Sequence, residues 1–133
     1  MYGSLDISTS ALVAQRTRLN VISANIANRE VLVNAQGQYA PYQRRIALLA
    51  SGDPASGRAE GVHVADIVTD DTLLFRYEPD SRFANADGYV GYPNVDPVKE
   101  MVNAMEASRS YEANIAAIEA TKSMINAALE VIA

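Results

Sequence analysis

No glycine or proline follows Pro97, and this absence of helix-breaking residues restricts the fold more than any other feature of the sequence. Asp96 and Pro97 make a good helix start, with Asp96 as the N-cap and Pro97 in the first helical position; Asn94 is the alternative cap. A helix from there to Ala133 forms a rod of roughly 54 Å, because each of about 36 residues adds about 1.5 Å. That rod is longer than a compact domain of 133 residues is wide.

A stripe of apolar residues, spaced by three and four, runs along this predicted helix. Its ten members, eight of them apolar, are Met101, Ala104, Ser108, Tyr111, Ile115, Ile118, Lys122, Ile125, Leu129 and Ile132. Since 49% of the chain is hydrophobic, chance would supply about five, so the pattern predicts a packing face. Six alanines stand off the stripe: Ala113, Ala116, Ala117, Ala120, Ala127 and Ala128. High helix propensity and a second packing face explain them equally well.

A second stripe with the same spacing lies near the N-terminus, between Ser4 and Asn28. Its seven members, five of them apolar, are Leu5, Ser8, Leu12, Gln15, Leu19, Ile22 and Ile26. The spacing predicts an N-terminal helix in heptad phase. The two helices can pack against each other, and both can present their stripes to other copies of the chain.

The segment between the two stripes is expected to be rich in β-structure. It holds six of the seven glycines, and residues 42–50, 61–69 and 73–77 read as short strands separated by turns at 51–57 and 85–88. We therefore expect a mainly α chain. Two long terminal helices (residues 1–28 and 95–133) pack as a coiled-coil-like pair, a small β-rich insert (residues 29–94) lies between them, and the three segments form one structural unit in an assembly.

The composition argues against most kinds of chemistry. The chain has no cysteine and one histidine, His63, so thiol catalysis, disulfides and cysteine-ligated metals are excluded. A net charge of −5, with no basic cluster larger than Arg44–Arg45, disfavours nucleic acid as a partner. Phosphate-binding loops and serine-nucleophile motifs are missing, and the acidic group at residues 66–71 does not match a calcium loop. We expect no catalytic residue, cofactor, metal or small-molecule substrate.

Several longer motifs resemble flagellar axial proteins. Residues 10–28, which end in Asn25-Ile26-Ala27-Asn28, are similar to the N-terminal signature of that family, where an asparagine-rich motif marks the end of the first helix. Residues 88–96 followed by Glu100-Met101-Val102, and residues 107–114, are similar to members from the proximal rod. Residues 41–44 and 77–79 match shorter family segments. The departures from the family pattern, at residues 29–36 and 80–83, fall in predicted loops.

The resemblance implies a structural subunit of the flagellar basal-body rod, in the periplasm, whose terminal helices polymerise into a helical drive shaft that transmits torque. It implies these partners: copies of the chain itself, rod proteins of the FlgB, FlgF and FlgG types, the rod-base adaptor, the membrane-ring protein and the flagellar type III export apparatus. Such subunits are exported without a cleavable signal, which agrees with the lack of a signal pattern in residues 1–10. We expect the assembly interface at Leu12, Leu19, Ile22, Ile26, Tyr111, Ile115, Ile118, Ile125 and Leu129.

Two other classes of protein remain open at this point. A secreted coiled-coil adaptor or effector that binds a single protein partner would carry the same stripes. A small peptidoglycan hydrolase would need an acid–base pair in a cleft. Electron microscopy of the purified protein separates a polymer-forming subunit from an adaptor, and an assay of glycan cleavage identifies a hydrolase.

Overall fold

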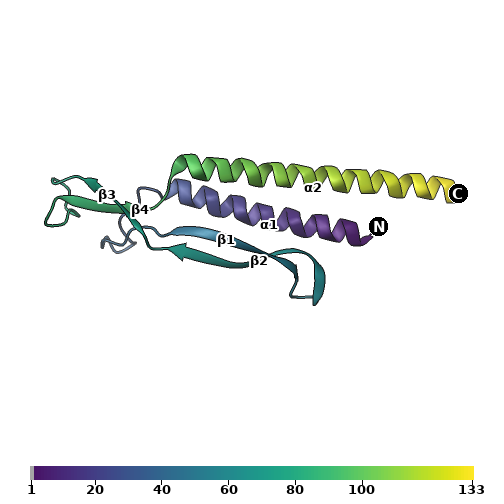
Figure 1. The fold of residues 1–133 in the computed structure, drawn as a ribbon, viewed down its shortest axis with the longest axis horizontal. Helices are drawn as coiled ribbons and strands as arrows, with labels where there is room; N and C mark the ends of the chain where they lie inside the picture. The colour runs from purple at the N-terminus through teal and green to yellow at the C-terminus, as the bar shows by residue number, and fades with distance from the viewer. Residues whose placement is uncertain (1) are drawn as a thin grey trace.

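The computed structural model describes residues 2–133 and has a helix at each end of the chain with strands between them (Figure 1). The helices are α1 (Tyr2–Ala27) and α2 (Pro97–Ile132), and the strands are β1 (Arg44–Asp53), β2 (Arg58–Asp70), β3 (Leu73–Tyr77) and β4 (Tyr89–Pro93). The predicted arrangement of two terminal helices around a β-rich insert is confirmed. None of the described helices is both long and apolar enough to cross a membrane.

The expectation of a mainly α chain understates the strands. The helices contain 26 and 36 residues, while the strands contain 10, 13, 5 and 5. Two physical causes explain the difference. The β1–β2 hairpin pairs further toward its turn than the apolar residues alone suggest, out to Asp53 and Arg58. The fourth strand, β4, was not predicted, because its sequence contains Gly91 and Pro93.

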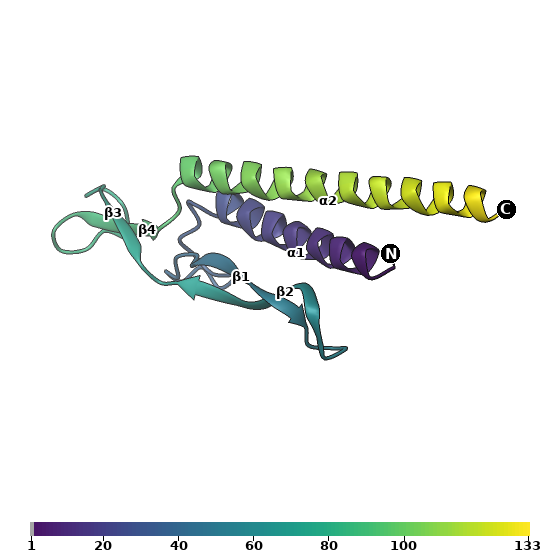
Figure 2. The same ribbon diagram turned by 45° about the vertical axis from the view of Figure 1, so that its right-hand side comes forward.

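The two helices lie side by side and run in opposite directions (Figures 1 and 2). Three side-chain contacts set their register: Ser4 Oγ to Thr121 Oγ1 at 3.3 Å, Arg18 Nη2 to Glu106 Oε2 at 3.5 Å, and Asn25 Nδ2 to Glu100 Oε2 at 3.4 Å. Since Ser4 is level with Thr121, residues 124–132 of α2 extend beyond the start of α1. We call this segment the overhang.

The ends of the helices follow from local sequence. Asp96 caps α2, as predicted, since its Oδ1 accepts a 3.0 Å hydrogen bond from the Val98 amide and Pro97 follows it. At the end of α1, Asn28 Nδ2 donates to the Ala24 carbonyl at 2.8 Å and satisfies an acceptor in the last turn of the helix. The chain then turns away toward the hairpin.

The strands form two separate antiparallel pairs, β1 with β2 and β3 with β4. The β1–β2 hairpin lies along α1 on the side away from α2, so α1 is the middle layer (Figure 2). Its register shifts between Leu48 and Leu49, a bulge that bends the hairpin along the helix. The β3–β4 pair lies beyond the end of the helix pair where α1 ends and α2 starts (Figure 1).

The molecule is extended and has a very small core. Its accessible surface is 8840 Å², whereas a compact monomer of 14.3 kDa exposes about 6,800 Å². The buried apolar residues are Ala14, Val21, Ile22, Val90, Val95 and Ala107. A chain that leaves this much surface uncovered gains little stability from its own packing, so additional burial has to come from other chains.

Candidate assembly interface

The contact between α1 and α2 follows a heptad stripe of α2. Its buried residues, Glu100, Ala107 and Thr121, are seven and fourteen positions apart, so they lie on one side of the helix. We call this side the seam; by its spacing it also contains Ala104, Tyr111, Asn114, Ile118, Ile125 and Ala128. Two of its three buried residues are polar, so the seam is a mixed contact and not a continuous apolar one.

The predicted stripe of α2 matches the seam at every second position only. Tyr111, Ile118 and Ile125 belong to the seam and are half-buried. Ile115 stands one residue beyond a seam position, which turns it outward, and is 37% exposed, while Leu129 lies in the overhang, beyond the start of α1, and is 59% exposed. The structure therefore divides the predicted interface of α2 into residues that contact its own α1 and residues that are left uncovered.

The predicted interface residues of α1 are covered within the chain. Ile22 is 6% exposed, and Leu12, Leu19 and Ile26 are half-buried. Ala14 and Val21, outside the predicted stripe, are buried as well, since the hairpin covers a second side of α1. A search for one apolar stripe finds one buried face of a helix, whereas α1 has two buried faces, one against α2 and one against the hairpin.

A buried polar cluster joins the helix pair to the hairpin. Asn25 is 1% exposed, and its Nδ2 donates to the Arg45 carbonyl at 2.8 Å and to Glu100. Its Oδ1 accepts from the Tyr42 hydroxyl at 3.0 Å and the Arg45 amide at 2.9 Å, so the side-chain amide has a partner for each of its four bonding positions. Glu100, also 1% exposed, pairs with the Arg44 guanidinium. We call these residues the junction.

Two tyrosines of the insert have raised pKa values for different reasons. Burial raises the pKa of Tyr42, because the junction gives its ionised form little water. For Tyr92, the leading cause is the hydrogen bond that its hydroxyl donates to Glu78, at 3.0 Å from Oε2, which raises the pKa by favouring the protonated form. Both tyrosines therefore act as hydroxyl donors: Tyr42 ties the insert to Asn25 of α1, and Tyr92 ties β4 to Glu78 within the insert.

The polar residues considered at the sequence level have structural partners. His63 Nδ1 lies 2.7 Å from the Gly52 carbonyl, a bond within the hairpin. Asp66 Oδ1 accepts from the Ile67 amide, and Asp70 accepts from the Thr72 amide and from Asn94 Nδ2. The bonds from Thr72 are the main cause of a lowered pKa at Asp70. Asp70 orders the turn after β2, whereas Asp66 bonds its neighbour within β2. No group of three or more His, Cys, Asp or Glu side chains that could hold a metal occurs among residues 2–133.

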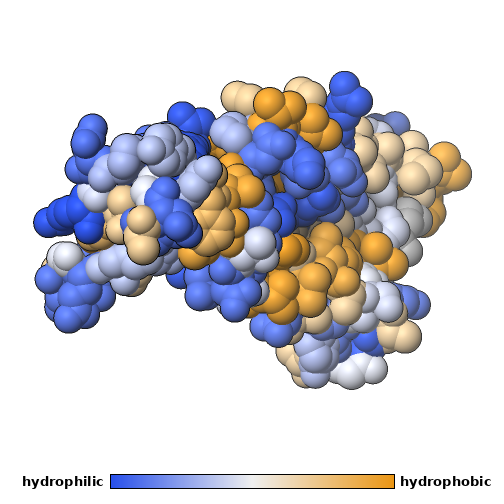
Figure 3. Space-filling model, turned by 60° about the vertical axis from the view of Figure 1, so that its left-hand side comes forward, coloured by the Kyte–Doolittle hydropathy of each residue, from blue (hydrophilic) through white to orange (hydrophobic). Residues whose placement is uncertain are grey.

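The side of α2 that faces away from α1 is apolar for much of its length. We call this side the outer face. It begins with Val98, Met101, Val102 and Met105, which are 69%, 61%, 52% and 56% exposed. The exposed alanines Ala113, Ala116 and Ala120 and then Met124 continue it. Figure 3 shows apolar patches open to solvent, at the top of the view over α2 and lower down over the hairpin.

The sequence analysis did not single out the first part of the outer face. Val98, Val102 and Met105 follow a helical spacing of four and three, which was the available signal. The longer heptad stripe starts at Met101 and obscured it. The junction residues Asn25 and Glu100 were noted only as parts of family motifs, because hydrogen bonds between distant residues leave no periodic pattern.

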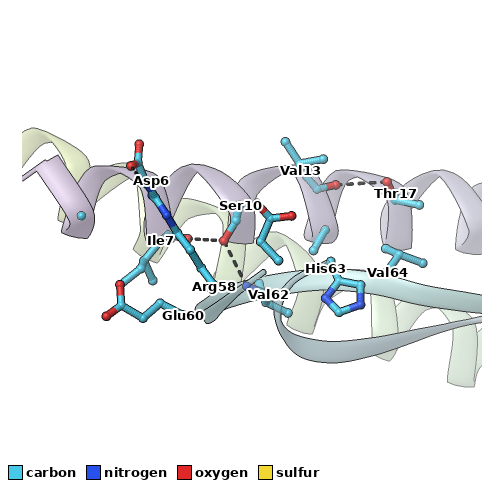
Figure 4. Close-up of a pocket in the computed structure, with 14 residues that line it drawn as sticks. Asp6, Ile7, Ser10, Val13, Thr17, Arg58, Glu60, Val62, His63 and Val64 are labelled. Atoms are coloured by element: carbon cyan, nitrogen blue, oxygen red, sulfur yellow. Dashed lines mark hydrogen bonds and ion pairs between the residues drawn. The ribbon is translucent and has the colours of Figure 1, made fainter. Parts of the chain in front are cut away.

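A groove separates the first half of α1 from the hairpin. It encloses about 370 Å³ and is lined by Gly3, Asp6, Ile7, Ser10, Val13, Ala14 and Thr17 of α1 and by Asp53, Arg58, Glu60, Gly61, Val62, His63 and Val64 of the hairpin. Ser10 Oγ accepts a 3.1 Å hydrogen bond from the Val62 amide and holds the two walls together (Figure 4). At one end Arg58 reaches toward Asp6, at 3.5 Å.

Comparison with known proteins shows the family. Residues 5–30 match the flagella basal body rod protein family, and residues 86–131 match the C-terminal family of the flagellar basal body rod FlgEFG proteins. The chain is 43% identical to the flagellar basal-body rod protein FlgC of Bacillus subtilis, over 98% of this chain and 97% of the relative. The chain belongs to the FlgC family of flagellar basal-body rod proteins. The FlgC of Salmonella typhimurium is 45% identical over 90% of this chain and 89% of its own, and that of Escherichia coli O6:H1 is 43% identical over the same shares.

Membership of the FlgC family confirms the expected class of protein. The chain is a structural subunit of the flagellar basal-body rod and is not an enzyme, and it assembles with itself and with other rod components. The comparisons do not support the alternative of a secreted adaptor. The two regions matched by the family models contain most of α1 and α2, the helices whose apolar surfaces exceed what one chain covers.

Proposed function

We propose that this FlgC-type chain polymerises in the proximal rod through its terminal helices and transmits torque as part of a helical drive shaft. The observation that carries the proposal is the outer face of α2, where large apolar side chains are more than half exposed over a helix of 36 residues. Monomeric proteins rarely leave a contiguous apolar surface of this kind uncovered. Neighbouring helices in a rod would cover it.

The rest of the fold supports the mechanical part of the proposal. A shaft under torque needs subunits that do not hinge between their segments. The junction fixes the hairpin to both helices through buried hydrogen bonds and the Arg44–Glu100 pair, so the three predicted segments, residues 1–28, 29–94 and 95–133, act as one unit. The heptad spacing of the seam supports a coiled-coil pairing of α1 and α2 in the assembled rod.

The proposal extends to location and partners. The partners are rod proteins of the FlgB, FlgF and FlgG types, the rod-base adaptor and the membrane-ring protein, all in the periplasm. Export uses the flagellar type III apparatus without removal of a leader. A contact between unlike surfaces repeated around an axis does not close, which gives a helical array of such subunits.

Leu129→Asp tests the proposed polymerisation. Leu129 is 59% exposed, so the aspartate is tolerated in the free subunit but places an unpaired carboxylate in a helix contact of the rod. We expect normal cellular amounts of the protein and loss of rods, hooks and swimming. Ala86→Asp adds the same charge on an exposed turn away from both helices and serves as the control. Normal rods containing the Leu129→Asp protein would refute polymerisation through this helix.

A further inference from the structure

The overhang is a part of α2 that its own chain leaves almost uncovered. Residues 124–132 continue the helix for about 14 Å beyond the start of α1, at about 1.5 Å per residue. Met124, Leu129, Val131 and Ile132 are 58%, 59%, 87% and 82% exposed. Glu130 is the single charged side chain of the segment. A helix end this apolar requires a partner if it is to stay ordered in water.

The groove beside α1 is long enough for the overhang and is partly apolar. Its α1 wall runs from Gly3 to Thr17, about 21 Å at the helical rise, so it is long enough for the overhang. Ile7, Val13, Val62 and Val64 supply apolar walls, and Ile7 and Val13 are still 42% and 62% exposed. The described lining also carries three carboxylates, Asp6, Asp53 and Glu60, and one cation, Arg58, at its end (Figure 4).

We propose that the overhang of one copy lies in the groove of a second copy of this chain, a contact that rests on the proposed polymerisation. The apolar side chains of the overhang cover Ile7 and the hairpin valines, and Glu130 faces Arg58. Arg58 already contacts Asp6 at 3.5 Å, but both side chains are about two-thirds exposed, so Glu130 can approach the guanidinium from the solvent side.

The overhang cannot reach the groove of its own chain. The register of the helices places Ile7 level with Ile118, and Val131 lies thirteen residues further along α2. The two positions are therefore about 20 Å apart along the axis. A straight helix cannot fold back over that distance, so the occupant comes from another molecule.

The proposed contact between two copies is small and repeats from one copy to the next. Each chain offers one overhang and one groove, which makes a head-to-tail contact that repeats without closing. Nine residues are fewer than the roughly 20–30 residues a side of a stable protein interface. The contact is thus too small to hold an isolated dimer and acts only where further contacts of an assembly bring the copies together.

Disulfide cross-linking tests the proposal in assembled rods, because the chain has no cysteine of its own. Cells produce two differently tagged copies, one carrying Ile7→Cys and one carrying Val131→Cys, and isolated basal bodies are oxidised with copper phenanthroline. A disulfide requires Cα atoms within about 7 Å, so a linked pair of the two tags reports the proposed contact. We expect this heterodimer in basal bodies and not in the dilute purified subunit.

Two matched pairs decide the outcome. The negative control pairs Val131→Cys with Val98→Cys in place of Ile7→Cys. Val98 lies on the outer face, so this pair should give no heterodimer. Ser4→Cys with Thr121→Cys in one chain, where the native oxygens are 3.3 Å apart, should form an internal link and shows that oxidation works. If basal bodies contain this internally linked protein but the Ile7–Val131 heterodimer is missing, the proposed contact is wrong and the rod assignment stands. If neither the variants nor the wild-type chain enter basal bodies, both the proposed contact and the proposed polymerisation are wrong.

Discussion

Asn25 of α1 and Glu100 of α2 are hydrogen-bonded at 3.4 Å, and each is 1% exposed to solvent. The bond joins residues 75 positions apart and lies where the two helices and the hairpin meet. Buried polar groups lose their contacts with water on folding, so a cluster of this kind is stable only when every member has a partner. The junction meets that condition for both oxygen and nitrogen of Asn25.

Asn25→Ala should lower the free energy of unfolding by about 2–3 kcal/mol, because it leaves the Arg45 amide and the Tyr42 hydroxyl without their acceptor. Urea denaturation followed by circular dichroism measures the change. Asn28→Ala is the matched control: this asparagine makes one bond, to the Ala24 carbonyl, and its loss should cost about 1 kcal/mol or less. Equal losses for the two variants would contradict a special role of the junction.

The junction shows what could and could not be predicted from the sequence. Periodicity identified both helices, and Asp96 identified the start of α2, because these signals are local. The bond between Asn25 and Glu100 depends on how distant segments meet, which no local pattern encodes. The same reason explains the phase error in α2: eight apolar residues in heptad spacing predicted a face, but Glu100 and Thr121, which are polar, mark where α1 lies.

The missed strand has a related cause. β4 is five residues long and contains Gly91 and Pro93, residues that strands disfavour. It forms because β3 pairs with it across an intervening loop, with Phe75 opposite Gly91. The glycine leaves room for its neighbours, since a Cβ there would stand 2.8 Å from a Leu73 methyl and 2.9 Å from the Tyr39 hydroxyl, and these side chains would have to shift.

Gly52→Ala should destabilise the chain by about 2–3 kcal/mol, the upper part of the range for strained backbone. Gly52 has φ +88°, and an added Cβ would lie 2.9 Å from the backbone oxygen of Arg58, which cannot move aside easily. Gly37→Ala has a similar φ of +75° but meets no atom within 4 Å, so about 1 kcal/mol is expected. Thermal denaturation of the two variants compares them, and a larger loss at Gly37 would show that the hairpin accommodates the methyl group.

Thr72→Val should raise the pKa of Asp70 part of the way toward its ordinary value of 3.8, since the side-chain bond from Thr72 is the first cause of its lowered pKa and valine keeps only the amide bond. The pH dependence of the Asp70 carboxyl signal in NMR spectra measures this. A lowered pKa in the folded state contributes stability above the unfolded value, and the contribution is lost as pH falls through the folded value. The variant should therefore lose less stability in acid than the wild type does. An unchanged titration of Asp70 would assign the effect to other groups.

Ile118→Asp and Ile115→Asp should separate packing within the subunit from packing between subunits. Ile118 is half-buried, one turn before Thr121 on the seam, so its replacement should cost the subunit about 2–4 kcal/mol. Ile115 is 37% exposed and lies off the seam, so the subunit should lose about 1 kcal/mol or less while rods still fail to form. Calorimetry and electron microscopy give the two readouts. An Ile115→Asp protein that builds rods would restrict the assembly interface to other residues.

The outer face of α2 gives the most direct test of assembly, through a Val102→Cys variant that still supports swimming. Val102 is 52% exposed in the single chain, and the chain has no other cysteine. The account predicts that a maleimide reagent labels the free subunit rapidly, leaves the cysteine in isolated rods unlabelled, and labels it again once the rods are dissolved. Equal labelling of Val102→Cys in intact rods and in the free subunit would contradict the claim that neighbouring subunits cover this face.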